Sequence, residues 1–536
     1  MASPKPIFER VSRLLLRAAY LAALGIFLLT CAQFYLPGKG FTYLVMFGDR
    51  ESDRYLPELK AMNTYRLPDS HGYDGQWYAQ IAMHPQLGDA VLRDAVDGVA
   101  YRARRILFCW TAYALAGGNP EWALQIFAVQ NIGCWLGLAW LMWWRWFPAT
   151  SWRNFIRWAG VLFSAGLSFS VRGSLLDGPS LLMIAGGMAL LEAGRPWWSA
   201  AMLGVAGLGK ETNVLAGAAL AWPEERTLRG WAKVGARLTC LVLPLAVWLA
   251  VLSSWVGEGP SVGARNFALP LEGFWGKWFE IVNWYREGSP LWRGNALGLA
   301  AIVAQFLFFA LRPRWREAWW RVGAAYAGLM IVLGDAVWEG DGGATLRVLL
   351  PMTLAFNVLV PRGRAWWTLL LIGNLSVVLT RDAMIPPERE SYAVHGAGAL
   401  VASAATSQRV AVEFDANWYS REWSRFEVWR WNKGPATVRV ENPQAFALRA
   451  DVSFGLRAND ERSVIVREDG RELWRGILKK GERRDVLVRD VRLAPGMTTW
   501  HFDTDVPAVA PANADSRLLA VSLRDLEIRV TGREER

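Results

Sequence analysis

Residues 238–256 read LTCLVLPLAVWLAVLSSWV, an apolar run without a single charged residue. A helix needs about 20 such residues to cross the hydrocarbon core of a bilayer. Apolar runs recur on both sides of it, at 14–36, 121–143, 155–171, 178–193, 197–209, 212–222, 294–311, 319–337, 344–360 and 365–380. With the first run as an uncleaved anchor helix, the sequence predicts an α-helical polytopic membrane protein with about 11 membrane segments.

The composition supports a membrane location and narrows the function classes. Hydrophobic residues make up 53% of the 536 residues and charged residues 20%, and 32 residues are Trp. Trp favours the membrane–water interface, and pairs such as Trp143 with Trp144 end apolar runs. The net charge of +11 is spread over short loops, so nucleic acid is not expected as a partner. The four cysteines lie in apolar context without metal-ligand spacing, which favours buried hydrophobes.

The loops between the runs predict the orientation of the chain. With the N-terminus inside, every second loop is expected on the cytoplasmic side, where Lys and Arg accumulate. The loops expected there carry Arg145, Arg153 and Arg157; Arg195; Arg226, Arg229, Lys233 and Arg237; Arg312, Arg314, Arg316 and Arg321; and Arg362 and Arg364. The alternate loops hold mixed charge, such as Lys210 with Glu211. A long outer loop is therefore expected over 37–105, followed by an interfacial helix over 106–116.

The C-terminal part has the pattern of strands. Apolar residues occupy every second position from Leu448 to Leu456, as in a half-buried strand. Asp469-Gly470 stands between two apolar stretches and predicts a hairpin turn. Further strands are expected at 486–488, 499–502, 519–523 and 526–530. We therefore expect a transmembrane domain over 1–390 and an extracytoplasmic all-β sandwich over 405–536.

Tryptophans crowd one stretch of this expected sandwich, at Trp418, Trp423, Trp429 and Trp431. If they are exposed, they would stack on sugar rings and make the domain carbohydrate-binding. If they are buried, they fill the core. The sequence leaves both interpretations open.

One polar segment carries the main candidate for chemistry. Residues 72–82 read GYDGQWYAQIA and are expected to pass from a loop into an amphipathic helix, with Trp77 and Ile81 toward the bilayer. Asp74 then stands at the start of this helix, on the outer side. Either Asp74 only caps the helix, which Asp does well, or its carboxylate takes a proton during catalysis.

The order of these features resembles a known family. An anchor helix, an outer loop with Y-D-G-Q-W-Y-A-Q-I-A at 73–82 and many Trp-rich helices resemble the GT-C superfamily of integral membrane glycosyltransferases. Within it, the likeness is to bacterial relatives of the glycolipid-anchor mannosyltransferases, and it covers roughly residues 10–380. Shorter matches are Arg104-Arg105-Ile106-Leu107, Asp177-Gly178-Pro179-Ser180, Lys210-Glu211-Thr212 and Arg347-Val348-Leu349-Leu350-Pro351. The order of the motifs and their shared outer placement carry the resemblance.

The resemblance implies a reaction and a catalytic carboxylate. Such enzymes pass a sugar from a polyprenyl phosphate to an acceptor outside the cytoplasm, with an aspartate of the first outer loop as general base. Asp74 is the candidate for this role. Asp49 is its rival, because some relatives place the base soon after the anchor helix. Asp177 is either a second carboxylate beside the acceptor or a helix cap near Pro179.

Cations are expected where the lipid phosphate leaves, because negative charge develops there. The candidates on the outer side are Arg104, Arg105, Lys210 and Arg347, and each is alternatively a snorkelling interfacial side chain. The residues expected around the donor or acceptor are Tyr73, Gln76, Trp77, Tyr78 and Glu211. No metal or other cofactor is expected, since the four His show no ligand spacing.

The resemblance therefore implies a membrane glycosyltransferase of cell-surface glycopolymer synthesis. Its expected partners are a polyprenyl-phosphate-linked sugar, membrane lipids, and a glycan, glycolipid or protein acceptor. Its expected location is the bacterial inner (plasma) membrane, with a cytoplasmic N-terminus and a periplasmic or extracellular C-terminal domain. The alternatives are a transporter or flippase of a lipid-linked glycan, and a non-catalytic glycan-assembly subunit.

Overall fold

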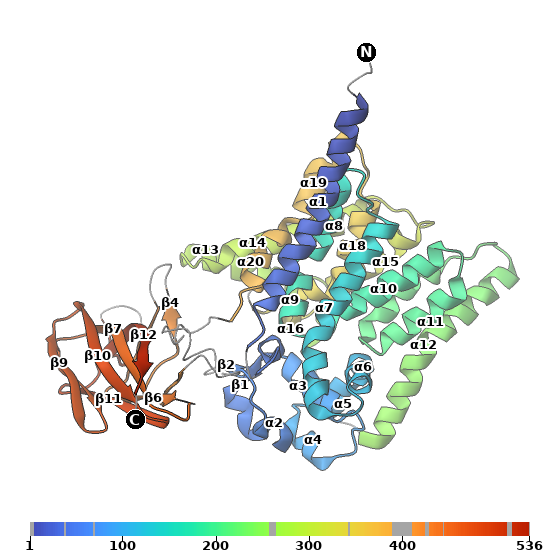
Figure 1. Cartoon of the computed structure of the whole chain (residues 1–536). Coiled ribbons are helices and arrows are strands. Elements are labelled where there is room, and N and C mark those ends of the chain that lie inside the picture. Colours follow the sequence, from blue (N-terminus) through green and yellow to red (C-terminus); the bar gives the residue numbers. More distant parts are fainter. Residues whose placement is uncertain are drawn as a thin grey trace. The chain divides into compact units, whose positions relative to one another are not determined.

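The computed structural model describes residues 5–36, 39–67, 70–256, 264–340, 344–387, 410–423, 428–442, 444–511 and 517–534. The chain forms a helical unit, Met1–Pro387, and a β unit, Glu388–Arg536 (Figure 1). The helical unit holds two clusters of buried apolar side chains and the β unit holds another.

Among the residues that the structure describes, four helices are long and apolar enough to cross a membrane. They are α1 (Lys5–Ala32), α7 (Pro120–Arg145), α12 (Leu228–Val256) and α14 (Leu291–Leu311). The start of α7 is set by its local sequence: Asn119 accepts a hydrogen bond from the Trp122 N–H, and Pro120 occupies the first turn. The run 238–256 forms the second part of α12. These helices mark the chain as a membrane protein.

The other apolar runs form shorter helices, so the prediction of about 11 spans is not confirmed. The remaining helices of this part of the unit, some of them outside the runs, are α8 (Trp152–Leu162), α9 (Ala165–Arg172), α10 (Asp177–Glu192), α11 (Pro196–Gly207), α13 (Glu272–Arg286), α15 (Ala318–Val332), α16 (Asp335–Trp338), α17 (Thr345–Val348), α18 (Leu350–Leu359), α19 (Trp367–Ile372) and α20 (Thr380–Ala383), with 3-10 helices at Glu211–Leu220, Ala264–Asn266, Arg364–Trp366 and Leu375–Leu379. The run 155–171, for example, breaks at Ser164 between α8 and α9. Broken helices are tolerated at membrane depth where protein covers their ends.

The loops fall into groups that contact one another across the sequence. In loops expected on the cytoplasmic side, Arg145 pairs with Glu192 at 3.0 Å, and the same carboxylate accepts the Trp319 indole N–H at 2.7 Å. In loops expected outside, Arg172 donates to the Tyr43 carbonyl at 3.0 Å. These contacts agree with loops that alternate between two ends of the unit. Which end faces the cytoplasm stays a prediction.

The stretch 37–105 folds onto an apolar core that it shares with α6 (Leu107–Leu115) and α7. Its elements are β1 (Phe47–Gly48), α2 (Pro57–Ala61), β2 (Arg66–Leu67), α3 (Gly75–Met83), α4 (Ala90–Ala95) and α5 (Val99–Arg102), with 3-10 helices at Thr42–Val45, Asp49–Arg54 and Ala103–Arg105. Trp77 (7% exposed) and Ile81 (0%) are buried here, so the prediction that they face the bilayer is wrong. The loop supplies its own apolar partners, such as Phe47 and Leu59, which the periodicity of 72–82 does not reveal.

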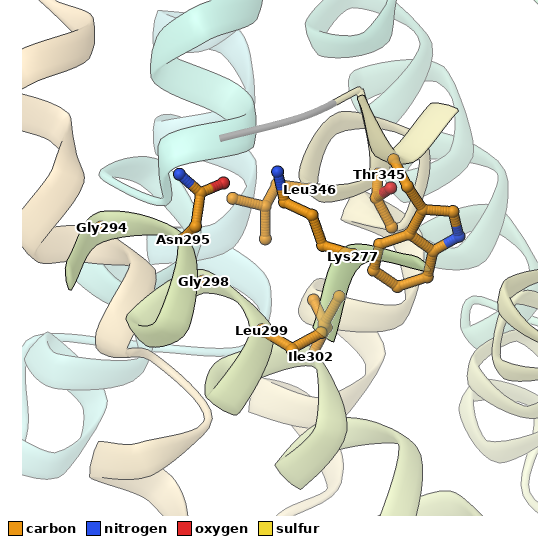
Figure 2. Close-up of a pocket in the computed structure, with 9 residues that line it drawn as sticks. Lys277, Gly294, Asn295, Gly298, Leu299, Ile302, Thr345 and Leu346 are labelled. Atoms are coloured by element: carbon orange, nitrogen blue, oxygen red, sulfur yellow. The ribbon is translucent and has the colours of Figure 1, made fainter. Parts of the chain in front are cut away.

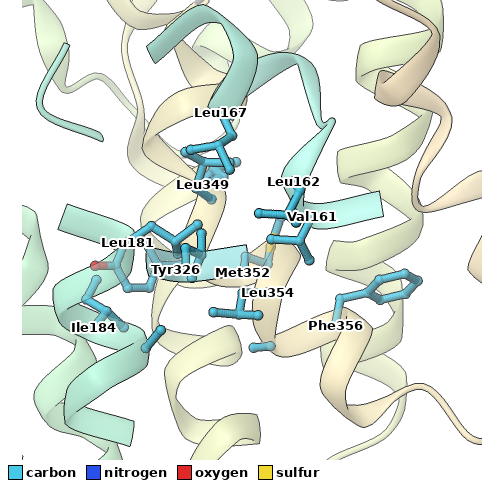
Figure 3. Packing of buried hydrophobic residues seen from close by; sticks show 14 of the residues in the cluster. Val161, Leu162, Leu167, Leu181, Ile184, Tyr326, Leu349, Met352, Leu354 and Phe356 are labelled. Atoms are coloured by element: carbon cyan, nitrogen blue, oxygen red, sulfur yellow. The ribbon is translucent and has the colours of Figure 1, made fainter. Parts of the chain in front are cut away.

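The main core of the helical unit packs short helices closely together (Figure 3). Leu181 and Ile184 of α10, Tyr326 of α15 and Met352 of α18 belong to one cluster of almost fully buried side chains. Lipid tails are as apolar as leucine, so close packing and dispersion, more than exclusion of water, stabilise such a cluster. Close contact needs small residues, and α9 provides one: a Cβ on Gly166 would lie 2.2 Å from the Leu346 carbonyl oxygen of α17.

The β unit contains two five-stranded sheets whose inner faces share one core. Its strands are β3 (Ala411–Phe414), β4 (Glu422–Trp423), β5 (Val428–Trp431), β6 (Ala436–Asn442), β7 (Leu448–Ala458), β8 (Arg462–Glu468), β9 (Arg471–Leu478), β10 (Arg483–Leu493), β11 (Gly496–Thr504) and β12 (Val521–Arg533). The sheet orders are β10-β7-β12-β5-β4 and β3-β6-β11-β8-β9. The alternation in 448–456 forms β7, which pairs with both β10 and β12.

Two sequence features of the β unit can be compared directly with the structure. The predicted hairpin is confirmed: β8 and β9 are joined by Asp469 and Gly470, both with positive φ (43° and 93°), as a two-residue turn requires. The strands expected at 519–523 and 526–530 form one strand, β12, with a register shift between Arg524 and Glu527. Asp525, at φ 45°, makes this bulge, which interrupts the alternation in the way that a turn would.

Three of the clustered tryptophans of the β unit, Trp418, Trp429 and Trp431, are buried or half-buried, and the Trp423 side chain lies outside the described part of the structure. Trp418 is 6% exposed, and its ring contacts Phe502 in the core. Trp429 and Trp431 are half-buried. The Arg524 guanidinium lies over the Trp429 ring, 4.8 Å from the centroid of that ring. Core packing therefore accounts for Trp418.

Candidate active site

Asp74 stands at the N-cap position of α3, but its side chain makes no capping hydrogen bond. Instead, its Oδ1 lies 3.0 Å from Nη1 of Arg102. The Asp74 side chain is 39% exposed, so a ligand can reach the carboxylate. The start of α3 is packed tightly: a Cβ on Gly75 would lie 2.3 Å from the Gly173 carbonyl oxygen. Gly75 therefore lets the segment that carries Asp74 approach the end of α9.

Arg102 is the partner of Asp74 that the sequence analysis missed. It also binds Asp97 through two hydrogen bonds, of 3.0 and 2.7 Å, and its side chain is only 9% exposed. Its guanidinium lies over the rings of Tyr78 and Tyr101, 5.5 and 5.4 Å from their centroids. Such a planar cation, fixed by a fork of hydrogen bonds, holds the Asp74 carboxylate in one place.

Arg105 ties the loop to the segment after α11. Its Nε donates to Glu211 at 2.7 Å, and its Nη1 donates to the Tyr78 hydroxyl at 2.9 Å. Burial raises the pKa of the Glu211 carboxyl, but Arg105 outweighs this effect and holds the pKa below its usual range. Arg104 is exposed, and its guanidinium lies 5.9 Å from the Tyr101 ring centroid. A 3-10 helix has about three residues per turn, so positions 102 and 105 lie on one face and position 104 on another. This spacing is the signal in the sequence that would have identified Arg102 as a site residue.

Asp177 begins α10 and holds two cations. Its Oδ1 accepts a hydrogen bond from Nζ of Lys210, and its Oδ2 lies 3.0 Å from Nη1 of Arg347. Its side chain is 6% exposed and makes no helix cap. Burial raises the pKa of Asp177, but Lys210 and Arg347 outweigh it and keep the pKa well below its usual range. A carboxylate whose two oxygens are both bound by cations is a poor proton acceptor, and it holds those cations in fixed positions.

Arg347 is fixed from two sides. Besides Asp177, it contacts Tyr73, whose hydroxyl accepts from Nη2 at 2.7 Å and whose ring centroid is 5.5 Å from the guanidinium. The Tyr73 ring in turn packs edge-on against Phe169 of α9. Tyr73 immediately precedes Asp74, so the cation and the exposed carboxylate are connected through one residue.

A pocket of about 290 Å³ opens at Arg347. Its wall is formed by Ala165, Gly166, Phe169, Pro290, Leu291, Gly294, Leu346, Arg347, Leu379, Asp382 and Ala383. Most of these residues are apolar; Arg347 is a buried cation and Asp382 an exposed carboxylate. A site of this composition suits an amphiphile with an anionic group and a polar, hydroxyl-bearing part. The sequence analysis did not single out Asp382, which follows the last apolar run and belongs to no motif.

The other predicted site residues have structural contacts in the loop. Gln76 is 1% exposed, and its Oε1 accepts hydrogen bonds from the Gly48 N–H at 3.1 Å and the Tyr55 hydroxyl at 2.7 Å. Asp49 accepts the Ser70 N–H at 3.0 Å. Trp77 is buried in the core of the loop. The network therefore combines Tyr73, Asp74, Tyr78, Arg105, Asp177, Lys210, Glu211 and Arg347 with the unpredicted Arg102.

Within the part of the chain that the structure describes, no group of three or more His, Cys, Asp and Glu side chains is arranged to hold a metal ion. The expectation that no metal or other cofactor is required stays a prediction.

No family model and no curated protein matches the chain. Among solved structures, one that is similar is the arabinosyltransferase EmbB from Mycobacterium smegmatis, determined by cryo-electron microscopy, at 12% sequence identity and a TM-score of 0.26. The match covers 94% of this chain and 64% of that one, so this chain spans less than two thirds of it. At this TM-score the likeness does not establish a common fold.

Proposed function

We propose that this chain is an integral membrane glycosyltransferase that takes a sugar from a polyprenyl phosphate. The observation that carries the proposal is the position of Arg347, a fixed cation on the wall of an apolar pocket. The partly exposed carboxylate of Asp74 belongs to the same network through Tyr73. The resemblance of residues 73–82 to the GT-C superfamily supports the same conclusion.

On the donor side, the pocket would hold the first isoprenoid units and the phosphate of the lipid. Arg347 would bind the phosphate oxygens, and Lys210, on the other oxygen of Asp177, would add a second positive charge. As the sugar leaves, negative charge grows on the lipid phosphate, and preorganised cations stabilise that charge. Asp177 and Tyr73 act as positioning residues, because they fix the cations in place before the substrate arrives.

On the acceptor side, Asp74 would act as general base. The acceptor oxygen forms a bond to the anomeric carbon, the bond from that carbon to the phosphate oxygen breaks, and the acceptor proton passes to the Asp74 carboxylate. Arg102 occupies Oδ1, and no hydrogen bond to Oδ2 is present among the described residues. Asp382, an exposed carboxylate in the pocket wall, would accept hydrogen bonds from the hydroxyls of the bound sugar.

Native mass spectrometry of the protein purified in mild detergent tests this proposal. Retention of a polyprenyl phosphate, or of its sugar conjugate, supports the transferase and identifies the sugar. A pyrophosphate-linked oligosaccharide favours the flippase alternative or block transfer. Ordinary phospholipids alone count against a lipid-phosphate pocket and favour the assembly subunit.

Two variants, measured by the same native mass spectrometry, test whether the retained lipid is bound in the pocket at Arg347. Arg347→Gln should lose the retained polyprenyl lipid, because it removes the cation from the wall. Arg104→Gln removes the same type of side chain from an exposed position and should retain the lipid. Equal retention in both variants would contradict the assignment of Arg347 to the phosphate.

A further inference from the structure

Helix α13 (Glu272–Arg286) buries its Lys side chain and exposes large aromatic side chains, the opposite of what a helix on a water-soluble protein does with these residue types. The buried positions are Gly273, Lys277 and Ile281, spaced by four residues along one face. A Cβ on Gly273 would lie 2.4 Å from the Trp338 ring, so this face packs tightly on α16. The one Lys of the helix therefore points into the protein.

The Lys277 side chain is buried on that inner face, where its ammonium has hydrogen-bond partners. Its side chain is 5% exposed, and its Nζ donates to Glu280 at 2.9 Å and to the Gly340 carbonyl at 2.8 Å. The ammonium also lies 4.6 Å from the centroid of the Trp284 ring. Figure 2 shows Lys277 on the wall of a cavity beside Asn295 of α14.

The outer face of α13 is aromatic. Its large exposed side chains are Trp275 (51% exposed), Trp278 (48%), Phe279 (62%) and Tyr285 (63%). The preceding segment adds Phe267 (58%) and Leu269 (75%). The exposed charged residues Glu272 and Arg286 stand at the ends of the helix. In its middle, the Glu280 side chain is 37% exposed and is neutralised by Lys277, so Trp and Phe dominate the surface there. Water solvates such a surface poorly, whereas the headgroup layer of a bilayer favours Trp and Tyr.

The place of α13 in the chain points to the same surroundings. After Arg286 the chain turns at Gly288 (φ 72°) and enters α14, which is long and apolar enough to cross a membrane. The start of α14 therefore marks a membrane boundary, and α13 ends beside it. Pro290 and Leu291, in this turn, also line the pocket at Arg347.

We propose that α13 lies in the headgroup layer with its aromatic face in lipid, and that the α13–α14 turn is the entrance by which the lipid donor reaches the pocket. The second half of the proposal rests on the proposed function and names the route of its substrate. A bulky isoprenoid chain then stays in the bilayer while only its phosphate end passes Pro290 and Leu291 to reach Arg347. The aromatic face holds the entrance at the depth of the lipid phosphates.

A fluorescent label on position 279 tests the membrane contact. Phe279→Cys is prepared in a Cys134→Ala, Cys240→Ala background, which leaves only the buried Cys31 and Cys109, and is labelled with a nitrobenzoxadiazole in proteoliposomes. The matched control is Leu487→Cys, an equally apolar position that is 54% exposed in the β unit. Melting temperatures compared with wild type confirm that both variants fold.

The proposal expects spin-labelled lipids to quench the label at 279 and aqueous iodide to quench the label at 487. Quenching at 279 by iodide alone overturns the membrane contact. A label at 279 that neither agent reaches also overturns it and assigns the face to protein, with a second copy of the chain as the occupant to be checked by crosslinking.

The entrance is tested with the double variant Trp275→Ser, Trp278→Ser. Its KM should rise for a long-chain polyprenyl donor and stay unchanged for a short-chain, water-soluble donor, because only the long chain approaches from the bilayer. Equal changes of both KM values, or none, overturn the entrance role. If wild type transfers no sugar from either donor, the proposed function fails, while the quenching result still decides the membrane contact.

Discussion

Arg347 and Asp177 are 170 positions apart in the chain, yet their side chains meet at 3.0 Å. The other oxygen of Asp177 holds Lys210, so one buried carboxylate fixes two cations. Burying charge is costly unless partners compensate it, and a cluster with this composition keeps its geometry because each member neutralises another. Arg347 of this cluster also lines a mostly apolar pocket, so the cluster places a fixed positive charge on the pocket wall.

Replacement of Asp74 separates the two candidate bases. Asp74→Asn should lower the initial rate of sugar transfer by about 100-fold to 10,000-fold, the usual contribution of a general base. Asp49→Asn is the matched control and should keep the rate, because Asp49 accepts the Ser70 backbone N–H within the loop. The reverse result would make Asp49 the base.

Arg347→Lys tests the geometry of the phosphate contact while it keeps the charge. Lysine lacks the planar fork that reaches Asp177, Tyr73 and the pocket together, so we expect the Kd for a polyprenyl phosphate to rise about 10-fold or more. Titration of the reconstituted protein with the lipid, followed by native mass spectrometry, gives the Kd. An unchanged Kd would show that charge alone suffices and that the fork is dispensable.

Asp382→Asn should affect the sugar and not the lipid. The amide keeps the size of the side chain and removes the charge that favours hydroxyl donors. We expect a higher KM for the sugar-loaded donor and the same affinity for the sugar-free polyprenyl phosphate. A parallel loss of both would mean that Asp382 shapes the pocket as a whole.

The pH dependence of stability should report on Asp177. Its pKa is depressed in the folded protein, so its contribution to stability is present above the unfolded value of about 3.9 and is lost as pH falls toward the folded pKa. Asp177→Asn leaves two buried cations without their partner, which costs about 3–5 kcal/mol. The difference in melting temperature between wild type and this variant should be constant from pH 7 to about 5 and shrink below about 4. A difference that grows on acidification would contradict the assignment.

Gly75→Ala tests the close contact that brings α3 to α9. The new Cβ would meet the Gly173 carbonyl oxygen at 2.3 Å and the Val45 carbonyl oxygen at 2.8 Å. Moving these backbone atoms apart should cost about 1–3 kcal/mol, lower the melting temperature and displace Asp74 from the network. Gly235→Ala, in the interior of α12 with no atom within 4 Å of the new Cβ, is the control and should not destabilise.

The sequence by itself determined the features that local pattern encodes. Long apolar runs indicated the membrane helices, alternation indicated β7, and Asp469-Gly470 indicated a hairpin, because each depends on residues a few positions apart. It also marked Asp74 at a helix start in the polar outer loop, and Asp177, Lys210 and Arg347 near the ends of apolar runs. Their catalytic roles stay predictions.

Only the tertiary structure decided which of these residues meet. Arg102 binds Asp74, while its neighbour Arg104 is exposed, because the turn that carries them presents alternate faces to the core. Trp77 packs in the apolar core of the loop 37–105. Asp177 holds Lys210 and Arg347, which come from distant segments of the chain. Helix breaks such as Ser164 and the pocket at Arg347 depend on the packing of several helices at once. Periodicity indicates which face of a helix or strand is apolar. It does not indicate which segment packs on that face, because this depends on the shape and charge of segments distant in the sequence.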